Sequence, residues 1–213
     1  MTASVQIKIC GLTDEVGVDA CIAGNADWIG FVFFDRSPRY VTGQRARELA
    51  QRCNSTDGPE CVGLFVDPSD DEIAHVLDHV TLDVLQLNSS VERAHEIRQR
   101  FGLPVWLACS VSSRADLPAH EGIDRFVLDA RAPVHSDRPG GNGVAFDWSL
   151  TRGWSSPVPW LLAGGLNPGN VSDAIAVSGA LAVDVSSGVE SRPGIKDAEA
   201  IAAFIRAARG GDQ

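Results

Sequence analysis

Short apolar segments alternate with longer amphipathic segments along the chain, repeatedly and at spacings of roughly 20 to 30 residues, as strand–helix units do. The apolar segments are expected to be eight strands, at 6–10, 28–33, 61–65, 84–87, 105–108, 125–129, 160–163 and 181–185. Most are apolar on both faces, which is typical of parallel strands covered by helices. Eight such units favour a closed barrel over an open doubly wound sheet, and no Gly-x-Gly-x-x-Gly follows the first strand to indicate a dinucleotide fold. We therefore expect residues 1–213 to form one α/β domain, a single (β/α)8 TIM barrel.

The segments between these strands carry helix signals, although two of them are weak. Six helices are expected, at 14–23, 43–52, 68 onward, 90–101, 167–178 and 197–209. Pro168 is expected at an early helical position. The fifth and sixth connections carry weak signals, because Pro118 shortens one and only 147–153 is left for the other. Residues 131–146 form a long loop rich in Gly and Pro, and a loop of that length inside a compact barrel is usually functional.

Composition and charge argue against several classes of protein. A formal net charge of −10 argues against a nucleic-acid-binding surface, which requires a basic footprint. No apolar run is long enough to span a bilayer and the segment MTASVQIKIC does not resemble a signal peptide, so we expect a cytoplasmic protein with no membrane partner. The five histidines show no ligand spacing and the five cysteines form no Cys-x-x-Cys pair, so we expect no metal site and free thiols.

Binding groups of a parallel barrel gather at the carboxyl ends of its strands. Gly164 and Gly165 follow the seventh expected strand, and Ser186, Ser187 and Gly188 follow the eighth. Small residues let backbone N–H groups approach an anion, hydroxyl groups add donors, and the loops after strands seven and eight are the usual phosphate site of such barrels. Either motif alone could be a simple turn, but the two together in these places indicate phosphate binding.

Two ionisable side chains at strand ends are candidates for acid–base chemistry. Cys10 ends the first strand and Asp129 ends the sixth. A thiol acts as a base only as the thiolate, so its pKa has to fall towards the working pH. Lys8 shares a strand face with Cys10 and could lower that pKa, or it could pair with a carboxylate across the barrel. The alternatives are a packed thiol at Cys10, a turn-capping carboxylate at Asp129 and a space-filling salt bridge at Lys8.

Arg39 follows the second strand in a Ser-Pro-Arg-Tyr segment. A planar guanidinium suits bidentate recognition of a carboxylate, and the alternative is a solvated loop arginine. The negative net charge disfavours an anionic ligand, so backbone donors and one or two arginines would have to outweigh the global field.

Several motifs resemble the phosphoribosylanthranilate isomerase family, in order and spacing, along nearly the whole chain. They are KICGLT at 8–13, GFVFFDRSPRYV at 30–41, VGLFVDP at 62–68, VLD at 127–129, LLAGGLNPGNV at 161–171 and DVSSGVESRPGIKD at 184–197. The first and last of these together are specific. The resemblance implies an Amadori rearrangement in tryptophan biosynthesis, which converts N-(5-phosphoribosyl)anthranilate to 1-(2-carboxyphenylamino)-1-deoxyribulose 5-phosphate.

The resemblance also implies roles for individual residues. Asp129 would be the general acid that opens the furanose ring, and Cys10 the general base that removes the C2 proton. Arg39 falls where the family binds the anthranilate carboxylate, and Asp184 where a carboxylate can hold the sugar hydroxyls. The implied phosphate-binding segments contain Gly164, Gly165, Ser186, Ser187 and Gly188. Such chemistry needs neither a metal nor an organic cofactor.

Two departures from the family pattern lie at the barrel mouth. Where the family usually has Gln-Leu-His-Gly, this chain has Gln86, Leu87, Asn88 and Ser89. Where the family usually has Gly-Thr-Gly, this chain has Gly-Asn-Gly at 141–143. Because Asn can hydrogen-bond but cannot carry charge near neutral pH, these changes affect the expected rate and substrate preference rather than the reaction class.

Other functions are less well matched. The histidine-pathway aminoimidazole carboxamide isomerase performs the same chemistry but typically has an acidic residue where Cys10 stands. Indole-3-glycerol-phosphate synthase needs a longer chain and a lysine–glutamate set not found here. A non-catalytic sugar-phosphate-binding barrel would have no reason to keep both Cys10 and Asp129, whereas a substrate-shifted barrel of this kind stays open as an alternative. The expected partner is the small-molecule substrate, and a monomer and a homodimer are both compatible with the sequence.

Overall fold

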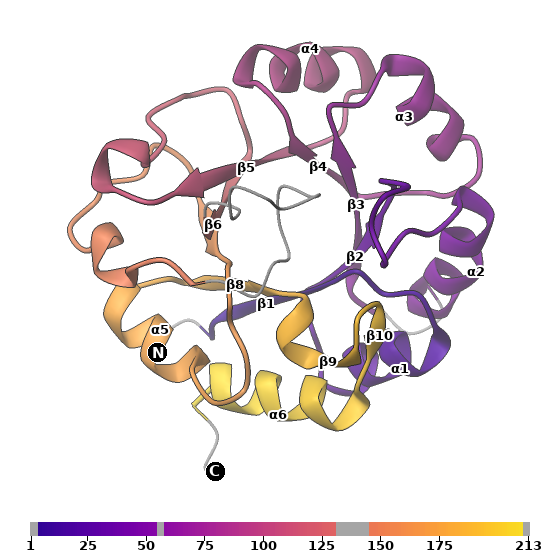
Figure 1. Ribbon diagram of the computed structural model, residues 1–213. Coiled ribbons are helices and arrows are strands. Elements are labelled where there is room, and N and C mark those ends of the chain that lie inside the picture. The colour runs from indigo at the N-terminus through magenta and orange to yellow at the C-terminus, as the bar shows by residue number, and fades with distance from the viewer. Residues whose placement is uncertain (1–3, 55–57, 131–144, 211–213) are drawn as a thin grey trace.

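The computed structural model describes residues 4–54, 58–130 and 145–210. Eight parallel strands form a closed barrel, in which each strand pairs with its neighbours in the sequence and β1 pairs with β8 (Figure 1). The strands are β1 (Gln6–Cys10), β2 (Trp28–Val32), β3 (Glu60–Val66), β4 (Val84–Asn88), β5 (Val105–Val111), β6 (Arg125–Ala130), β7 (Trp160–Leu162) and β8 (Ala182–Val185). The expected (β/α)8 barrel is confirmed, with small shifts at the strand ends.

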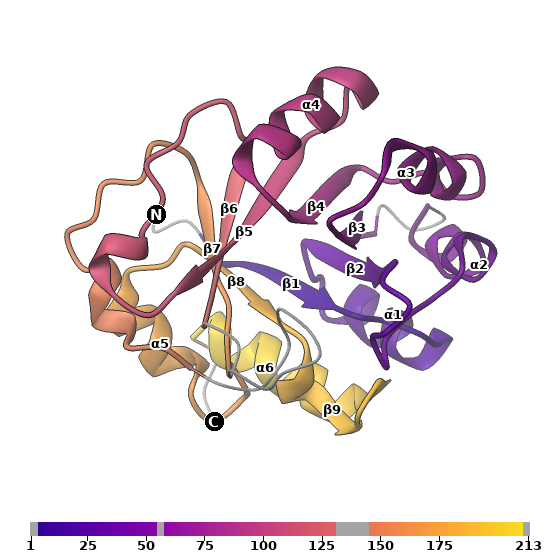
Figure 2. The same ribbon diagram turned by 45° about the horizontal axis from the view of Figure 1, so that its top comes forward.

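Helices surround the ring of strands (Figures 1 and 2). The α-helices are α1 (Glu15–Ala23), α2 (Gly43–Asn54), α3 (Asp70–Leu77), α4 (Val91–Phe101), α5 (Val171–Ser178) and α6 (Ala198–Ala208). In the described residues, the two connections with weak helix signals contain only the short 3₁₀ turns η1 (Arg114–Asp116) and η2 (Trp148–Thr151). A third turn, η3 (Ser187–Val189), follows β8 and leads into a hairpin of β9 (Glu190–Arg192) and β10 (Ile195–Lys196).

Closure of the barrel decides which functional segments are neighbours. β1 pairs with β8 on one side, with Lys8 opposite Asp184, and with β2 on the other side, with Cys10 opposite Gly30. Because all eight strands are parallel, their carboxyl ends lie at the same rim. The segments that follow β8 and β2 therefore flank Cys10.

The apolar residues form two cores, one inside the barrel and one between the strands and the helices. The inner core consists of Trp28, Val62, Val84, Trp106, Val127, Leu161, Ala163 and Ala182. Near the amino-terminal ends of the strands, the rings of Trp28 and Trp106 meet edge to face at 5.0 Å, and the Arg125 guanidinium lies 4.8 and 5.5 Å from their centres. These side chains fill that end of the barrel interior.

Most helices begin at the capping residues that the sequence indicates. Asp14, Ser69, Ser90 and Asp197 each accept a backbone N–H from the first turn of their helix. The prediction for α5 is wrong at its start, because the helix begins at Val171 and Pro168 lies in the turn before it. Asn167 accepts the N–H of Gly169 at 2.8 Å, and Asn170 accepts the N–H of Asn167 at 2.8 Å, so amide side chains hold a turn where a helix was predicted.

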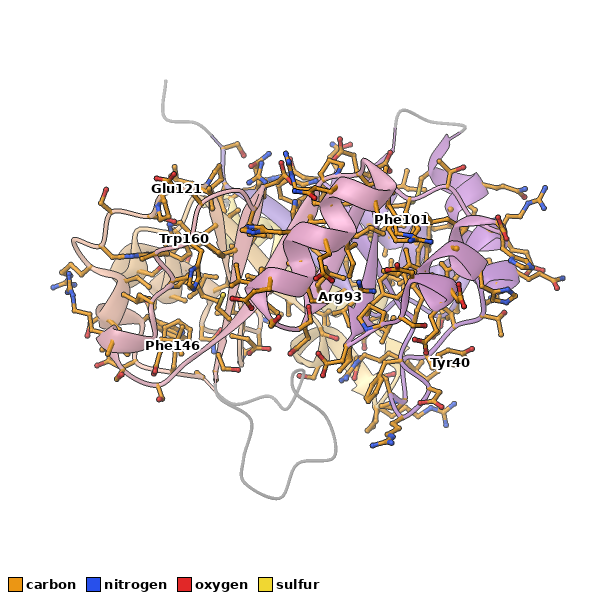
Figure 3. All side chains as sticks on the ribbon, turned by 90° about the horizontal axis from the view of Figure 1, so that it is seen from above. Tyr40, Arg93, Phe101, Glu121, Phe146 and Trp160 are labelled. Atoms are coloured by element: carbon orange, nitrogen blue, oxygen red, sulfur yellow. The ribbon has the colours of Figure 1, made fainter. Side chains whose placement is uncertain are left out.

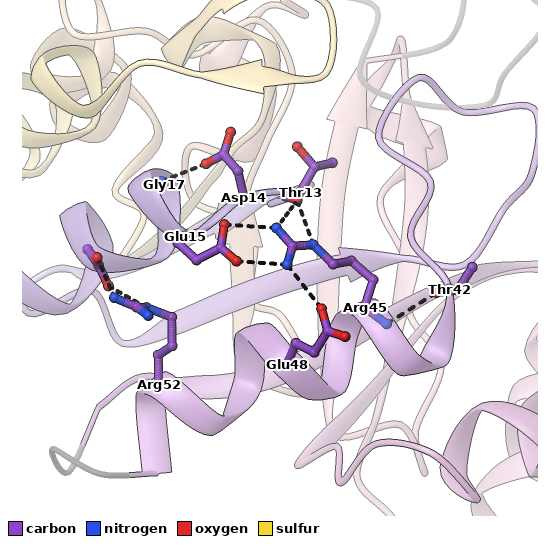
Figure 4. Close-up of polar contacts among 9 residues, drawn as sticks. Thr13, Asp14, Glu15, Gly17, Thr42, Arg45, Glu48 and Arg52 are labelled. Atoms are coloured by element: carbon purple, nitrogen blue, oxygen red, sulfur yellow. Dashed lines mark hydrogen bonds and ion pairs between the residues drawn. The ribbon is translucent and has the colours of Figure 1, made fainter.

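One arginine ties α1 and α2 to the loop after β1 (Figure 4). Arg45 donates to both carboxylate oxygens of Glu15 at 2.8 and 2.9 Å, and to the carbonyl of Thr13 at 3.3 and 3.2 Å. The hydroxyl of Thr13 donates in turn to the carbonyl of Gly194, between β9 and β10, at 2.9 Å. These bonds fix the loop that directly follows Cys10.

The two ends of the barrel can be told apart in Figure 3. Trp160, the first residue of β7, lies towards the upper end, whereas Tyr40, which follows β2, and Phe146, which follows β6 along the chain, lie towards the lower end. The lower end is therefore the carboxyl rim. Residues 131–144 lie outside the described part of the chain, so the expectations for the 131–146 loop and Asn142 stay predictions. Among the described helices, none is both long and apolar enough to cross a bilayer.

Trp106→Ala is expected to lower the free energy of unfolding by about 3–5 kcal/mol, because the substitution leaves a cavity in the barrel interior. Trp106 is 2% exposed, whereas Val16 on α1 is 61% exposed, so Val16→Ala serves as the control and should cost less than about 0.5 kcal/mol. Urea unfolding followed by circular dichroism measures both values. Similar losses in the two variants would contradict the role of Trp106 in the inner core.

Candidate active site

A cavity of about 880 Å³, counting the space open to solvent, lies at the carboxyl rim and is lined by residues of, or directly after, all eight strands. Of the residues predicted from the sequence, the cavity is lined by Cys10, Arg39, Asp129, Gly164, Gly165, Asp184, Ser186 and Ser187. Gly188 lies close by but does not line it.

A buried ion pair lies beside Cys10. Lys8 Nζ is 2.9 Å from Asp184 Oδ1, and Lys8 is fully buried. Lys8 therefore pairs with a carboxylate, one of the possibilities that the sequence left open, but the partner is on the neighbouring strand β8 rather than across the barrel. Burial by itself lowers the pKa of Lys8, but Asp184 and then Cys10 outweigh it and hold that pKa above its ordinary value. Lys8 is therefore a cation next to the thiol.

Cys10 is 4% exposed, at the point where β1 reaches the rim. Burial raises the pKa of its thiol above the ordinary value, Lys8 opposes this shift, and Asp184 adds to it. Lys8 thus acts in the direction that the sequence suggested, but the net shift is upward. In the ligand-free protein Cys10 is a neutral thiol near neutral pH.

The sequence left two alternatives open for Asp129, a carboxylate that faces the site and a carboxylate that caps the next turn, and the structure shows features of both. It lines the cavity, and its Oδ1 accepts the backbone N–H of Ala130 at 2.7 Å. In the ring of strands, β7 and β8 separate β6 from β1. The carboxylate and the Cys10 thiol therefore reach the cavity from different sides, as an acid and a base acting on two atoms of one ligand would.

Arg39 is not a solvated loop residue, since it is only 5% exposed. Its Nε lies 2.6 Å from Glu190 Oε1 and its Nη2 lies 3.0 Å from Glu190 Oε2. The aliphatic part of Arg39 packs over Gly11, where an added Cβ would meet Arg39 Cδ at 2.5 Å. The absence of a side chain at Gly11 therefore makes room for Arg39 directly beside the end of β1.

Two residues behind Arg39 carry no signal of their own in the sequence. Glu190 is the first residue of β9 and Lys196 the last residue of β10, and Lys196 Nζ donates to Glu190 Oε1 at 2.8 Å. Burial raises the pKa of Glu190, but hydrogen bonds and charges from Arg39 and Lys196 outweigh it and hold that pKa below its ordinary value. Burial lowers the pKa of Lys196, and Glu190 opposes this only in part. Both residues lie in the 184–197 motif, but nothing in their spacing predicts contact with Arg39.

The loops after β7 and β8 bring backbone donors to one side of the cavity. Gly164 and Gly165 have φ values of 84° and 64°, which favour glycine. Within the described residues, the N–H groups of Gly164, Gly165 and Ser187 donate to no protein acceptor. Gly188 packs behind them, where any Cβ would overlap the carbonyl oxygen of Leu166. The arrangement suits an anion with several acceptor oxygens.

A polar side chain in the cavity wall also lacks a partner. Gln86 on β4 is 3% exposed, and its Oε1 has no hydrogen-bond partner among the described residues. An unpaired buried acceptor costs about 1–3 kcal/mol, so this position suits a ligand group that donates a hydrogen bond. The sequence places Gln86 near a strand end but indicates no role for it. Asn88, from the same strand, lines the cavity as well.

The fold and the cavity define a (β/α)8-barrel protein with a small-molecule site at its carboxyl rim, suited to an anionic ligand. Within the described residues, no cluster of three or more His, Cys, Asp or Glu side chains could hold a metal ion. The family model described as N-(5'phosphoribosyl)anthranilate (PRA) isomerase matches residues 7–207. The chain belongs to this family of isomerases.

Relatives and solved structures agree with this assignment. A protein named N-(5'-phosphoribosyl)anthranilate isomerase from Paramagnetospirillum magneticum is 52% identical, over 97% of this chain and 98% of its own. A protein of the same name from Rhodospirillum rubrum is 53% identical, over 96% and 98%. The crystal structure of the phosphoribosyl anthranilate isomerase from Thermotoga maritima has a TM-score of 0.84 and 36% identity, over 97% of this chain and 99% of its own.

A further solved structure of a phosphoribosyl anthranilate isomerase is a complex with reduced 1-(o-carboxyphenylamino)-1-deoxyribulose 5-phosphate. It has a TM-score of 0.81 and 34% identity, over 97% of this chain and 99% of its own. That ligand carries a carboxylate at one end and a phosphate at the other.

Two substitutions are expected to move the pKa of Cys10 in opposite directions. Lys8→Met removes the cation that lowers this pKa, so it should rise further, whereas Asp184→Asn removes an anion that raises it, so it should fall. Because the thiolate is the nucleophile, the rate of Cys10 alkylation by iodoacetamide reports the thiolate fraction at each pH. At a pH below the pKa, Asp184→Asn should react faster than wild type and Lys8→Met more slowly.

Mass spectrometry of the Cys10 peptide separates this reaction from that of the other cysteines. Glu96→Gln, at an exposed position on α4, is the matched control and should leave the pH profile unchanged. Lys8→Met also leaves Asp184 buried without its partner, which costs about 3–5 kcal/mol, so circular dichroism must show that each variant is folded. Shifts in the same direction for the two variants would contradict this electrostatic account.

Proposed function

We propose that this protein is a phosphoribosylanthranilate isomerase of tryptophan biosynthesis in which Cys10 is the general base and Asp129 the general acid. The observation that carries the proposal is the place of Cys10 on β1, between the backbone donors after β7 and β8 and Arg39 after β2. N-(5-phosphoribosyl)anthranilate has a phosphate at one end, a carboxylate at the other and the reacting carbons between them. A substrate that spans these two anchors brings its C2 towards Cys10.

The reaction moves protons and electrons within one molecule. Asp129 protonates the furanose ring oxygen, the bond between C1 and that oxygen breaks, and the nitrogen lone pair forms a protonated Schiff base. Cys10 takes the proton from C2, and the electron pair of that bond forms the enolamine. The enolamine becomes the ketone when C1 gains a proton and the C2 hydroxyl loses one. The substrate nitrogen is the electron sink, so the steps call for no metal or organic cofactor.

The raised pKa of Cys10 is compatible with this role. A thiolate buried without substrate would cost free energy, so the resting protein keeps the thiol neutral. The protonated Schiff base places a positive charge close to Cys10, which lowers its pKa and raises the thiolate fraction when the base is needed. Lys8 and Lys196 act in the same direction in the free protein.

The remaining polar groups fit the rest of the substrate. The N–H groups of Gly164, Gly165 and Ser187, with the hydroxyl of Ser186, receive the phosphate, and Gly188 keeps the two loops close together. Arg39 binds the carboxylate through Nη1, the guanidinium nitrogen that its pair with Glu190 does not use. Asp184 on β8 and Gln86 on β4, on opposite sides of the ring, receive hydroxyl groups of the sugar.

The partner that we propose is the small-molecule substrate. A relative from Thermotoga maritima is described as dimeric, and a monomer and a homodimer are the two assemblies that we consider for this protein. We place the protein in the cytoplasm as a single barrel domain, where its five cysteines, all of them free thiols, stay reduced.

Turnover tests the function and the two roles together. The substrate is generated in situ from anthranilate and phosphoribosyl pyrophosphate, and the loss of its fluorescence is followed. Wild type should be active, and Cys10→Ala and Asp129→Asn should each lower kcat by about 10²–10⁴-fold, the usual contribution of a general acid or base.

Cys109→Ala and Asp173→Asn are the matched controls, since neither residue lines the cavity, and both should retain wild-type activity. Activity that survives Cys10→Ala would refute the base assignment while leaving the reaction in place. A wild-type protein that binds the reduced product but turns over no substrate would instead be a binding barrel.

A further inference from the structure

Arg39 is held from behind by a carboxylate that does not itself line the cavity. We propose that Glu190 is a positioning residue that fixes the Arg39 guanidinium at the cavity wall, and that Lys196 holds Glu190 in turn, so that this buried group sets the preference for a carboxylated ligand. The inference rests on the proposed function, because it takes Arg39 as the group that meets the carboxylate of the substrate.

Hydrogen bonds saturate the Glu190 carboxylate. Oε1 accepts from Arg39 Nε at 2.6 Å and from Lys196 Nζ at 2.8 Å, and Oε2 accepts from Arg39 Nη2 at 3.0 Å and from the Gly194 N–H at 3.3 Å. The side chain is 4% exposed and is absent from the cavity lining. Glu190 therefore makes no direct contact with a ligand in the cavity and acts on it through its charge and through the groups that it holds.

Lys196 anchors this carboxylate to the loop after β8. Its Nζ donates to the carbonyl of Ser186 at 2.9 Å, to the Ser186 hydroxyl at 3.4 Å and to Glu190. The ammonium is fully buried, so all three of its donors are directed at protein acceptors. Because Ser186 lines the cavity, the chain of contacts runs from the wall at Arg39 to the wall at Ser186.

The charges of this group explain how an acidic protein can hold an anion here. Arg39 and Lys196 are cations and Glu190 is the single anion between them, whereas the nearby Lys8–Asp184 pair is neutral. The buried group therefore carries a net positive charge in a chain whose formal net charge is −10. In a low-dielectric site, such a local charge outweighs distant surface carboxylates that salt and water screen.

Glu190 has two opposing effects on an anionic ligand. As an anion near the site it weakens binding, and as a bidentate partner it keeps the long Arg39 side chain in one orientation. If charge alone mattered, Glu190→Gln would bind a carboxylated ligand more tightly. If positioning dominates, as we infer, Glu190→Gln binds that ligand less tightly.

The test is a comparison of two ligands by isothermal titration calorimetry. One is reduced 1-(o-carboxyphenylamino)-1-deoxyribulose 5-phosphate, and the other is the same molecule without the carboxylate. Wild type should prefer the carboxylated ligand. Glu190→Gln should reduce that preference by about 10–100-fold, the value of one well-placed charge-assisted hydrogen bond, and should have little further effect in an Arg39→Ala background.

Two more variants separate positioning from charge and from folding. Glu190→Asp keeps the charge, but its side chain is too short for the same bidentate contact, so it should also reduce the preference for the carboxylated ligand. This variant replaces Glu190→Gln in the test if Glu190→Gln does not fold. Glu199→Gln, at an exposed position in the first turn of α6, is the matched control and should keep the wild-type preference. An unchanged or increased preference in both Glu190 variants, or equal losses for the two ligands, would overturn the inference.

These outcomes are distinct from failure of the proposed function. A wild-type protein without turnover whose ligand preference still depends on Glu190 would refute the function and keep the inference. A wild-type protein that turns over the substrate, but whose ligand preference is independent of Glu190, would keep the proposed function and refute the inference.

Discussion

The pairing of β1 with β8 is the constraint on which the site depends. Because all eight strands are parallel, their carboxyl ends lie at one rim. Because β1 pairs with both β8 and β2, Cys10 lies between the segments that follow those two strands. The same register sets Lys8 beside Asp184 in the barrel wall. The placement of a thiol between an anion-binding loop and a guanidinium therefore follows from strand order, and the short motifs after the strands supply the chemistry.

The two buried groups of charged side chains near the rim have different roles. The Lys8–Asp184 pair is neutral overall, adjusts the pKa of Cys10 from two sides and lines the cavity through its carboxylate. The Arg39–Glu190–Lys196 group carries net positive charge and joins the loop after β2 to the loop after β8. Buried ion pairs seldom add much to stability, because desolvation offsets their attraction. Their presence at the rim rather than in the helix-facing core fits binding and catalysis.

The sequence predicted the features that depend on local pattern. The eight-unit alternation gave the barrel, and the residues at the ends of the expected strands gave most of the cavity lining. Features that depend on contact between distant segments were not predictable: Arg39 and Glu190 are 151 residues apart, and the net upward shift of the Cys10 pKa comes from burial, which only the fold creates. The late start of α5 depends on two amide side chains that compete with the helix for backbone bonds.

A crystal structure of this protein with reduced 1-(o-carboxyphenylamino)-1-deoxyribulose 5-phosphate tests the central claim most directly, because it shows which way the ligand lies across Cys10. The account predicts the phosphate on the N–H groups of Gly164, Gly165 and Ser187, the carboxylate on Arg39, and C2 within about 3–3.5 Å of the Cys10 sulfur, the distance of a near-attack geometry. A ligand bound in the reverse direction, or with C2 out of reach of Cys10, would contradict it.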